Sequence, residues 1–186
     1  MSKVFVFNFV TLNGFFKGPS EDISWHRHGA EENEYAEKML GAGGTLLFGR
    51  VTYQMMASYW PTPEAIKSDP AVAKGMNKAK KVVFSRTLEK ADWNNTRVVN
   101  ADLEGEIKRI KRAGKDLTVL GSGTIVDQLA QAGLVDEYQI MIDPVALASG
   151  TTIFAGIQRN LDLKLKKAKV FESGIVLLRY RPVKSG

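Results

Sequence analysis

Strand-like and helix-like segments alternate along this sequence from residue 4 to residue 142, and two strand-like segments close the chain. Each early strand-like segment is short, apolar and rich in β-branched and aromatic residues, as are strands buried on both faces of a sheet. These segments are VFVFNFV, TLLFG, VVFSR, TRVVN, LTVLG and DEYQIMIDPVAL. The alternation predicts an α/β domain, in which helices cover both faces of a mainly parallel central sheet.

The last two strand-like segments, LDLKLKKAKVFES and GIVLLRYRP, are separated by a turn signal at Ser173 and Gly174 and predict a hairpin. We therefore expect antiparallel strands at the C-terminal edge of the sheet. Between the earlier strands, apolar periodicity and the end signals of glycine and proline predict helices. These helices are expected over residues 31–40, 50–60, 70–80, 103–112 and 124–132.

The bulk composition fits one soluble globular domain that spans residues 1–186, with 44% hydrophobic and 25% charged residues. The absence of cysteine excludes disulfides and thiolate catalysis, and it suits a reducing cytoplasm. The N-terminal segment lacks the features of a signal peptide, and no apolar run approaches the ~20 residues that span a bilayer. We therefore expect a cytoplasmic protein that does not act at a membrane.

The net charge is +6, and basic residues cluster in the segments IKRIKRAGK and LKLKKAKV. One interpretation is a surface that binds nucleic acid. The other is the solvated face of a helix and an edge strand, where lysine also discourages pairing with other edges. Neither run contains aromatic residues that could stack on bases, so we favour the second interpretation and expect no nucleic-acid partner. A positive field would also benefit a phosphorylated ligand.

Two glycines occupy the junction between a strand and a helix in the segment VLGSGTIVDQL. Gly121 and Gly123 allow the backbone to approach a ligand closely and to take positive φ, and the N–H groups at a helix start favour phosphate. The segment matches neither the P-loop nor the usual dinucleotide fingerprint. The alternative is that the glycines only shape a tight turn. Asp127 would compete with a phosphate, unless it caps backwards onto Thr124.

Polar residues follow two other strands as well. LLFGRVTYQMM leaves a strand through Gly49 and enters a helix with Arg50 and Thr52 at its start, and VVFSR ends in Ser85 and Arg86. Open α/β sheets bind ligands at the carboxyl ends of their parallel strands. Three such junctions together can hold a dinucleotide along its length.

Several motifs in the same order resemble the dihydrofolate-reductase-like family. More narrowly, they resemble its branch that shares the C-terminal reductase domain of the bifunctional riboflavin-biosynthesis deaminase/reductase. The motifs are VTLNGFF, LLFGRVTYQMMASYWP, VVFSRTLEKADWNNTRVV and VLGSGTIVDQLAQAGLVDEYQIMIDPVALASGTTIF. The resemblance covers nearly the whole chain. It implies a three-layer α/β/α fold, NADPH as the cofactor and a homodimer.

The resemblance also implies which residues bind the cofactor. The matched positions are Gly49, Arg50 and Thr52 for the cofactor phosphates, Ser85 and Arg86 near the adenosine 2′-phosphate, and Gly121, Ser122, Gly123, Thr124 and Ile125 at the pyrophosphate. Arginine suits a phosphate dianion because its planar guanidinium donates two hydrogen bonds at once.

The residues that protonate and contact the substrate are less clearly matched. Dihydrofolate reductases place a carboxylate on the first helix, and Glu31 and Glu32 lie nearest to that place, although acids in a helix's first turn are also favourable without catalysis. Asn13 stands where relatives often carry Asp, and is expected to contact the substrate or the nicotinamide. His26 and His28 can donate protons near neutral pH. As an isolated pair they do not predict a metal site, and the alternative is that both are surface histidines.

The sequence thus predicts an NADPH-dependent reductase that transfers hydride to a heterocycle, such as a pterin or dihydrofolate-like compound or a 5-amino-6-(5-phosphoribosylamino)uracil-like compound. The alternative is a non-catalytic protein that keeps the reductase fold and binds NADP(H) or a pterin. The homodimer is also supported by the apolar character of DEYQIMIDPVAL and GIVLLRYRP, which exceeds what the edge of a monomer usually tolerates.

Overall fold

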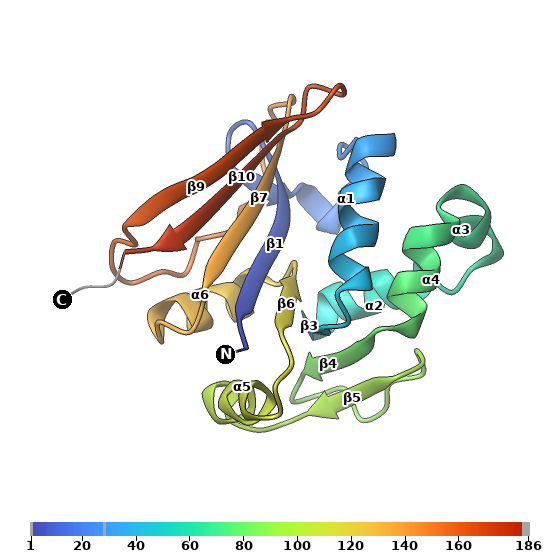
Figure 1. Cartoon of the computed structure of the whole chain (residues 1–186), viewed down its shortest axis with the longest axis vertical. Helices are drawn as coiled ribbons and strands as arrows, with labels where there is room; N and C mark the ends of the chain where they lie inside the picture. Colours follow the sequence, from blue (N-terminus) through green and yellow to red (C-terminus); the bar gives the residue numbers. More distant parts are fainter. Residues whose placement is uncertain (1, 28, 184–186) are drawn as a thin grey trace.

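The computed structural model describes residues 2–27 and 29–183 and contains ten strands. The strands are β1 (Val4–Thr11), β2 (Phe15–Lys17), β3 (Thr45–Gly49), β4 (Lys80–Phe84), β5 (Thr96–Val99), β6 (Leu117–Leu120), β7 (Glu137–Asp143), β8 (Thr151–Thr152), β9 (Leu163–Val170) and β10 (Val176–Pro182). Eight of them form one sheet in the order β5-β4-β3-β6-β1-β7-β10-β9 (Figure 1), and β2 pairs with β8 in a separate ribbon.

The six strands from β5 to β7 are parallel, and β10 runs antiparallel to both β7 and β9. This arrangement confirms the predicted α/β fold with antiparallel strands at its C-terminal edge. From β3 to β5 the chain adds strands towards one edge of the sheet. It then returns with β6, which lies between β3 and β1, and adds the later strands towards the other edge. Ligands of open α/β sheets bind at such reversals, beyond the carboxyl ends of the strands.

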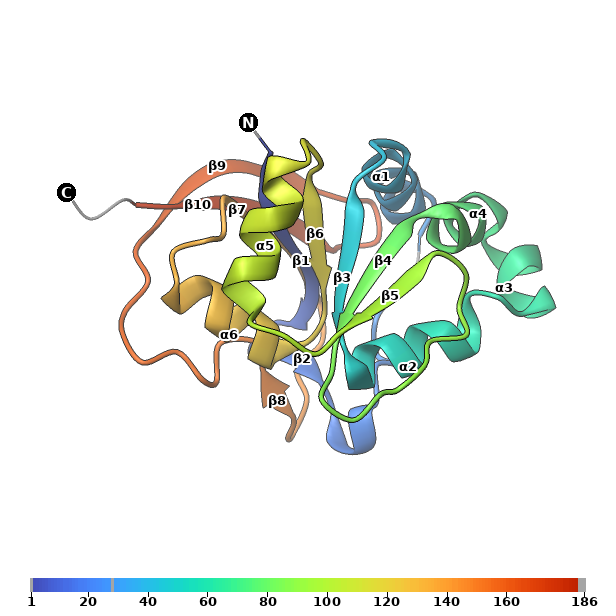
Figure 2. The ribbon, with the colours of Figure 1, turned by 90° about the horizontal axis from the view of Figure 1, so that it is seen from below.

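Six α-helices and one short 3₁₀ helix connect the strands in the described part of the chain. They are η1 (Pro19–Glu21), α1 (Ala30–Gly41), α2 (Arg50–Tyr59), α3 (Pro63–Ser68), α4 (Pro70–Lys78), α5 (Leu103–Arg112) and α6 (Gly123–Gln131). Figure 2 shows α5 and α6 on one side of the sheet, with α2, α3 and α4 on the other.

Each layer of helices buries its own apolar cluster against the sheet. On one face, side chains of α1, α2 and α4 pack with Phe7, Phe48 and Leu177. On the opposite face, α5 and α6 pack with Val6, Val119 and other strand residues. Burial of apolar area on both faces is the main source of stability for a sheet of this kind.

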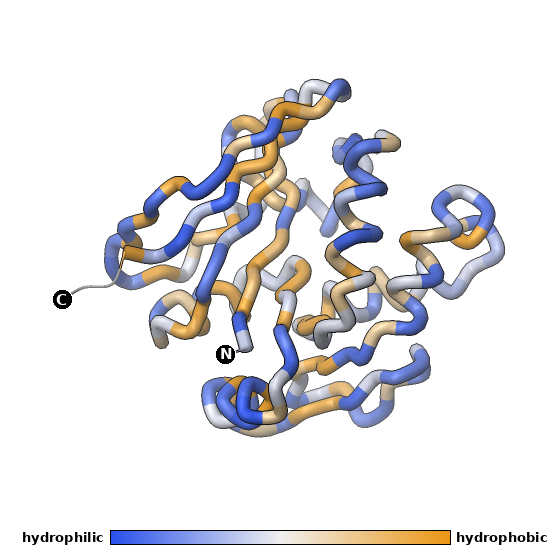
Figure 3. Tube along the Cα trace, in the orientation of Figure 1, coloured by the Kyte–Doolittle hydropathy of each residue, from blue (hydrophilic) through white to orange (hydrophobic). Residues whose placement is uncertain are grey.

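Most predicted elements are confirmed with small shifts of their bounds, and α5 has the predicted bounds. The patterns did not reveal α3, and they did not reveal the ribbon formed by β2, which follows β1, and β8, which follows β7. The two basic runs lie on the exposed face of α5 and on the edge strand β9, as in the second interpretation above. Figure 3 shows hydrophilic residues interspersed among apolar ones along both elements.

One premise of the predicted homodimer is wrong. The two apolar segments that were expected at an exposed edge form β7 and β10, and both are interior strands of the sheet. The edge beyond β10 is β9, which carries four lysines. Such an edge resists pairing with another strand edge.

Candidate functional site

Two strand-to-helix junctions touch each other at the carboxyl edge of the sheet. The adjacent strands β3 and β6 lead into α2 and α6, which start on opposite faces. A Cβ atom added at Gly49 would overlap the Ser122 Oγ, and one added at Gly121 would lie 2.8 Å from the Thr52 Cγ2. Ile125 also contacts the Gly49 position. Five of the residues that sequence reasoning assigned to the cofactor are therefore brought together here.

The backbone at the second junction has an unusual conformation. Gly121 and Ser122 both have positive φ, of 61° and 57°. Gly123 does not, so the expectation of positive φ was correct for Gly121 and wrong for Gly123. A Cβ at Gly123 would lie 3.4 Å from the Phe16 ring, which belongs to the β2–β8 ribbon. A non-glycine residue held in the left-handed region costs energy and often marks a functional site.

Both helices begin without capping by a side chain of their N-cap residue. Gly49 precedes α2 and Ser122 precedes α6, and within the described residues neither makes a capping side-chain hydrogen bond. The first turns of these two helices also contain no acidic residue. The N–H groups and the positive end of each helix dipole are therefore directed towards the same region, which is suited to an anion.

A buried asparagine on β1 extends this region. The Gly121 N–H donates a hydrogen bond to the Asn8 Oδ1 at 3.0 Å, and Asn8 is only 3% exposed. The Asn8 Nδ2 has no hydrogen-bond partner among residues 2–27 and 29–183. Sequence reasoning missed this residue. The available signal was a single amide in the otherwise apolar strand VFVFNFV.

The remaining predicted cofactor residues lie at the same edge, because β4 is the parallel neighbour of β3. The Ser85 Oγ accepts hydrogen bonds from the Thr87 and Leu88 N–H groups and so shapes the turn after β4. Arg86 and Thr124 are exposed to solvent. The exposed Arg50 donates to the Gln54 Oε1 at 3.0 Å. Arg86 thus lies on the surface, next to the turn that Ser85 shapes.

Asp127 does not oppose an anion at the start of α6, and it does not cap Thr124. Its carboxylate accepts a hydrogen bond of 2.9 Å from the Gly156 N–H, in the loop after β8. Burial raises the pKa of this carboxyl, with the Gly156 hydrogen bond acting in the opposite direction. The side chain thus fastens the loop to α6 and turns away from the helix start.

Glu31 and Glu32 connect the start of α1 to the turn of the β9–β10 hairpin. The Glu31 carboxylate accepts hydrogen bonds of 2.8 Å from the Lys169 Nζ and from the Glu172 N–H. The buried Glu32 accepts one from the Ser173 Oγ. The hydrogen bond from Lys169 is the main cause of a lowered pKa of Glu31. A general acid needs a raised pKa, so these contacts favour a structural role for Glu31.

Asn13 ties together two loops at the carboxyl edge. Its Oδ1 accepts from the Thr11 Oγ1 at 2.8 Å and from the Leu147 N–H at 3.2 Å, and its Nδ2 donates to the Leu147 carbonyl. The turn after β1 is thereby joined to the loop after β7. These hydrogen bonds fix the two loops relative to each other at the ends of β1 and β7.

A histidine and an aspartate form a buried pair at the same edge. The His26 Nδ1 lies 2.9 Å from the Asp143 Oδ2, and the Asp143 carboxylate also accepts a hydrogen bond from the Arg27 N–H. The His26 ring stacks on Phe9, with 3.5 Å between the ring centroids. His26 is thus buried and not a surface histidine, whereas His28 lies outside the described residues.

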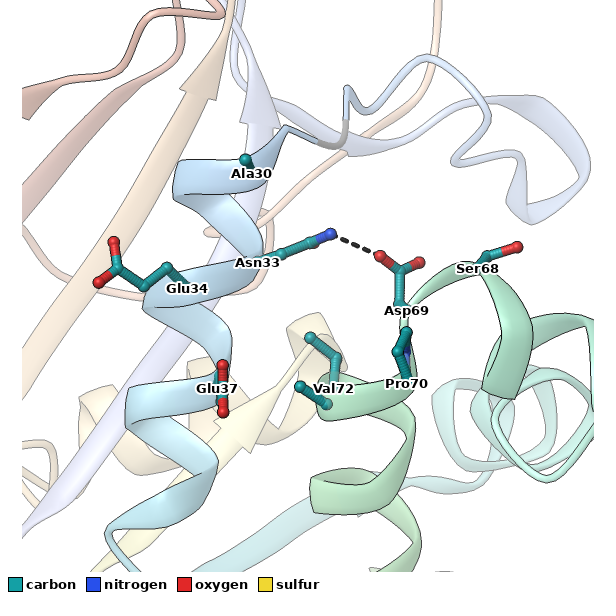
Figure 4. Close-up of a pocket in the computed structure, with 9 residues that line it drawn as sticks. Ala30, Asn33, Glu34, Glu37, Ser68, Asp69, Pro70 and Val72 are labelled. Atoms are coloured by element: carbon teal, nitrogen blue, oxygen red, sulfur yellow. Dashed lines mark hydrogen bonds between the residues drawn. The ribbon is translucent and has the colours of Figure 1, made fainter.

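A surface pocket lies elsewhere, between α1 and α4 (Figure 4). Glu34, Glu37 and Asp69 contribute acidic groups to its lining, and the Asn33 Nδ2 donates to the Asp69 Oδ1 at 2.5 Å. An anionic cofactor does not suit such a lining. Among the described residues, no group of three or more His, Cys, Asp or Glu is arranged to hold a metal ion. No helix in this part of the chain is long and apolar enough to cross a membrane.

Solved structures of other proteins share this fold. A solved structure from Shewanella sp. PV-4, provisionally named a riboflavin biosynthesis protein, superposes with a TM-score of 0.77 at 18% identity, over 98% of this chain and 99% of that one. The diaminohydroxyphosphoribosylaminopyrimidine deaminase/5-amino-6-(5-phosphoribosylamino)uracil reductase of Thermotoga maritima superposes with a TM-score of 0.71 at 14% identity. That match covers 98% of this chain and 57% of the larger one.

Sequence comparison agrees with the structural one. The uncharacterized protein YyaP of Bacillus subtilis is 29% identical over 172 residues, which are 92% of this chain and 90% of the relative. The family model of the RibD C-terminal domain matches residues 2–177. This chain therefore belongs to the RibD C-terminal domain family.

Proposed function

We propose that this protein is an NADPH-dependent reductase that transfers hydride to a heterocyclic substrate. The substrate class is a pterin or dihydrofolate-like compound or a 5-amino-6-(5-phosphoribosylamino)uracil-like compound. The observation that carries the proposal is the meeting of two uncapped helix starts over Gly49 and Gly121. Because Gly49 and Gly121 lack a Cβ, Ser122 and Thr52 can pack against them, and the two helix starts come together. Two neighbouring helix N-termini suit the diphosphate of a dinucleotide.

The cofactor residues take distinct roles in this proposal. The N–H groups at the start of α6, with the Ser122 and Thr124 hydroxyls, bind the diphosphate. Arg50 and Thr52, at the start of α2, bind phosphate oxygens from the other face of the sheet. Arg86 binds the adenosine 2′-phosphate, which distinguishes NADPH from NADH. Membership of the RibD C-terminal domain family supports this assignment.

The cofactor supplies the hydride, so the protein has to orient the reactants and deliver a proton. β1 leads from Asn8, beside the glycine junction, to Thr11, which is paired with Asp143. Three residues of strand span roughly 10 Å. The His26–Asp143 pair therefore lies beyond the diphosphate region along β1, and we assign His26 the delivery of the proton. Asp143 orients its ring.

The test combines binding with turnover. Calorimetry should show NADPH binding, and a screen of dihydrofolate, pterins and pyrimidine ribitylamine precursors should show substrate-dependent loss of NADPH absorbance. His26→Gln should lower kcat and leave the NADPH affinity unchanged. Binding without turnover for every substrate tried would favour the alternative of a non-catalytic NADP(H)-binding or pterin-binding protein. Absence of NADPH binding would contradict the proposal.

The predicted homodimer now has a different candidate surface, on one face of the C-terminal strands. Val176 is paired with both Ile142 and Val170, and Leu178 is paired with Ile140 and Ala168, so these residues form two apolar rows across the face. Val170 is 70% exposed. We propose that a second copy of the chain covers this face around a two-fold axis.

Light scattering tests this interface directly. Wild type should have the mass of a dimer at micromolar concentration, and Val170→Glu should have the mass of a monomer. Lys167→Glu is the control, because Lys167 is paired with Arg179 and belongs to the other face of the same edge strand. A monomeric wild type, or a dimeric Val170→Glu variant, would contradict the proposed interface.

A further inference from the structure

Asn8 is a polar exception on a buried face of β1. The alternating residues Val4, Val6 and Val10 belong to the apolar cluster under α5 and α6, and Asn8 occupies the position between Val6 and Val10. Its side chain is nevertheless 3% exposed. Burial of an amide is unfavourable unless its donors and acceptor find partners, so a specific interaction is expected at this position.

The orientation of the Asn8 amide is determined by its neighbour. The Gly121 N–H is a donor, so the atom that faces it at 3.0 Å has to be the acceptor Oδ1. The other terminal atom is then Nδ2, which is a donor and has no partner among the described residues. One half of the amide is satisfied, and the N–H groups of the other half are buried without a partner on the side chain that contacts Gly121.

The unpaired donor lies where β6 leaves the sheet. Leu120 is the last residue of β6 that is in register with β1, and its partner is Phe7. At the next position, the Asn8 side chain takes over the hydrogen bonding of the Gly121 N–H. Two residues further, α6 begins with its uncapped N–H groups. The first turn of α6 and the Asn8 amide thus supply unsatisfied N–H donors from two elements. We expect a hydrogen-bond acceptor to bind there.

We propose that the Asn8 Nδ2 donates a hydrogen bond to a phosphate oxygen of the ligand bound between the starts of α2 and α6. Through its Oδ1, the same side chain holds Gly121 in the conformation that opens this site. Asn8 is thereby a binding residue and a positioning residue together. This inference rests on the proposed NADPH site and adds a residue to it from the central strand of the sheet.

The sharpest variant is Asn8→Asp. It keeps an oxygen acceptor for the Gly121 N–H and replaces the Nδ2 donor by an anionic oxygen of nearly the same size. By calorimetry, we expect its affinity to fall about 30-fold or more for NADPH and for inorganic diphosphate. Asn95→Asp is the matched control, because it makes the same chemical change in the exposed turn before β5, and it should keep the wild-type affinity.

A second variant covers the case in which Asn8→Asp does not fold. Asn8→Ala removes both halves of the amide and should lower both affinities about tenfold. In the wild type, the side-chain amide resonances of Asn8, identified by their absence from the Asn8→Ala spectrum, should shift when diphosphate is added. Unshifted resonances, or wild-type affinity in Asn8→Ala, would mean that Nδ2 does not contact the ligand and that water satisfies it instead.

The two ligands separate this inference from the proposed function. If wild type and Asn8→Asp bind NADPH equally well, the role of Asn8 is overturned and the reductase proposal stands. If wild type binds diphosphate but not NADPH, the reductase proposal fails, and the effect of Asn8→Asp on diphosphate still decides the role of Asn8. If wild type binds neither ligand, both are overturned.

Discussion

The starts of α5 and α6 occupy comparable places, since each helix follows a parallel strand at the carboxyl edge and packs on the same face of the sheet. Asp102 precedes α5, and its carboxylate accepts a hydrogen bond of 2.7 Å from the Gly105 N–H, while Glu104 and Glu106 lie in the first turn. Ser122 precedes α6 and provides no such cap, and the first turn of α6 contains no acid. The chain thus supplies anions at the start of α5 and none at the start of α6.

Side chains of the protein itself therefore satisfy the start of α5, whereas the start of α6 remains uncapped. A side-chain cap stabilises a helix by about 0.5–2 kcal/mol, and α6 forgoes this contribution. The left-handed conformation of Ser122 adds a further cost. Burial of Ile125, Val126 and Leu129 against the sheet stabilises α6 nonetheless. α6 is therefore held in place by packing while its first N–H groups stay uncapped. Such a helix start can bind an external anion.

The largest effect is expected for Gly121→Ala. Its Cβ would lie 2.8 Å from the Thr52 Cγ2 and push the two helix starts apart, so the NADPH affinity should fall by about 3 kcal/mol. Gly114→Ala, after α5, is the control because Gly114 also has positive φ but has open space around it. In thermal melts Gly114→Ala should lose about 1 kcal/mol of stability because of its positive φ. Gly121→Ala should lose more, because the contact with Thr52 adds to the same backbone cost. Equal NADPH affinity in the two variants would remove Gly121 from the site.

Arg86→Ala should show whether the open region extends to the end of β4. Loss of a charge-assisted contact to the 2′-phosphate should weaken NADPH binding by about 2 kcal/mol, and NADH binding should hardly change. Calorimetry with both cofactors makes this comparison within one variant. An equal loss for the two cofactors would mean that Arg86 does not contact the 2′-phosphate.

Ser122→Asp should give α6 the kind of start that α5 has. Aspartate tolerates the left-handed conformation, and its negative charge interacts favourably with the positive end of the α6 dipole, so the melting temperature should rise. The added negative charge should lower the NADPH affinity by about 1 kcal/mol through repulsion of the diphosphate. Opposite changes in stability and affinity are the expected signature. A variant that binds NADPH more tightly than wild type would contradict the anion site.

The smallest effects are expected at the start of α5, and they should affect stability alone. Asp102→Ala should destabilise the protein by about 1 kcal/mol without changing the NADPH affinity.

The hydrogen bond from the Arg109 guanidinium is the main cause of the low pKa of Glu106, which falls from 4.5 to about 2. Glu106 therefore stabilises the fold above its unfolded pKa, and this contribution is lost as the pH falls towards 2.

Denaturant unfolding of Glu106→Gln at two pH values checks this sign. At pH 7 the variant should be less stable than wild type by about 0.5 kcal/mol, because the ion pairs are largely at the surface. At a pH near 2 the difference should vanish. A difference that grows as the pH falls would show that another group is responsible.

The sequence predicted well those features that local patterns determine. The bounds of α5 follow from the stripe of Leu103, Ile107 and Ile110, and the glycine junctions follow from breaks between apolar strands and helices. α3 was missed because it has only six residues. The β2–β8 ribbon was missed because its two or three paired residues per strand carry no periodicity of their own.

Features that depend on distant contacts were not predictable in this way. The sequence shows that Asn8 is a polar residue in an apolar strand. It does not show the role of Asn8, because the Gly121 N–H that Asn8 binds is 113 residues away along the chain. Asp127 was recognised as a conflict, but the Gly156 N–H that binds it lies in a distant loop. The error about the dimer edge has the same origin, because an apolar strand pattern does not reveal which strands lie beside it.

The central claim is that α2 and α6 start at a diphosphate site while α5 does not. Two-dimensional amide NMR spectra of the wild type, recorded during a titration with NADPH, test it directly. The account predicts large shifts for the amides of residues 50–52 and 121–124 and none for those of residues 103–105. Shifts confined to other parts of the sheet edge, or larger at the start of α5 than at the start of α6, would contradict it.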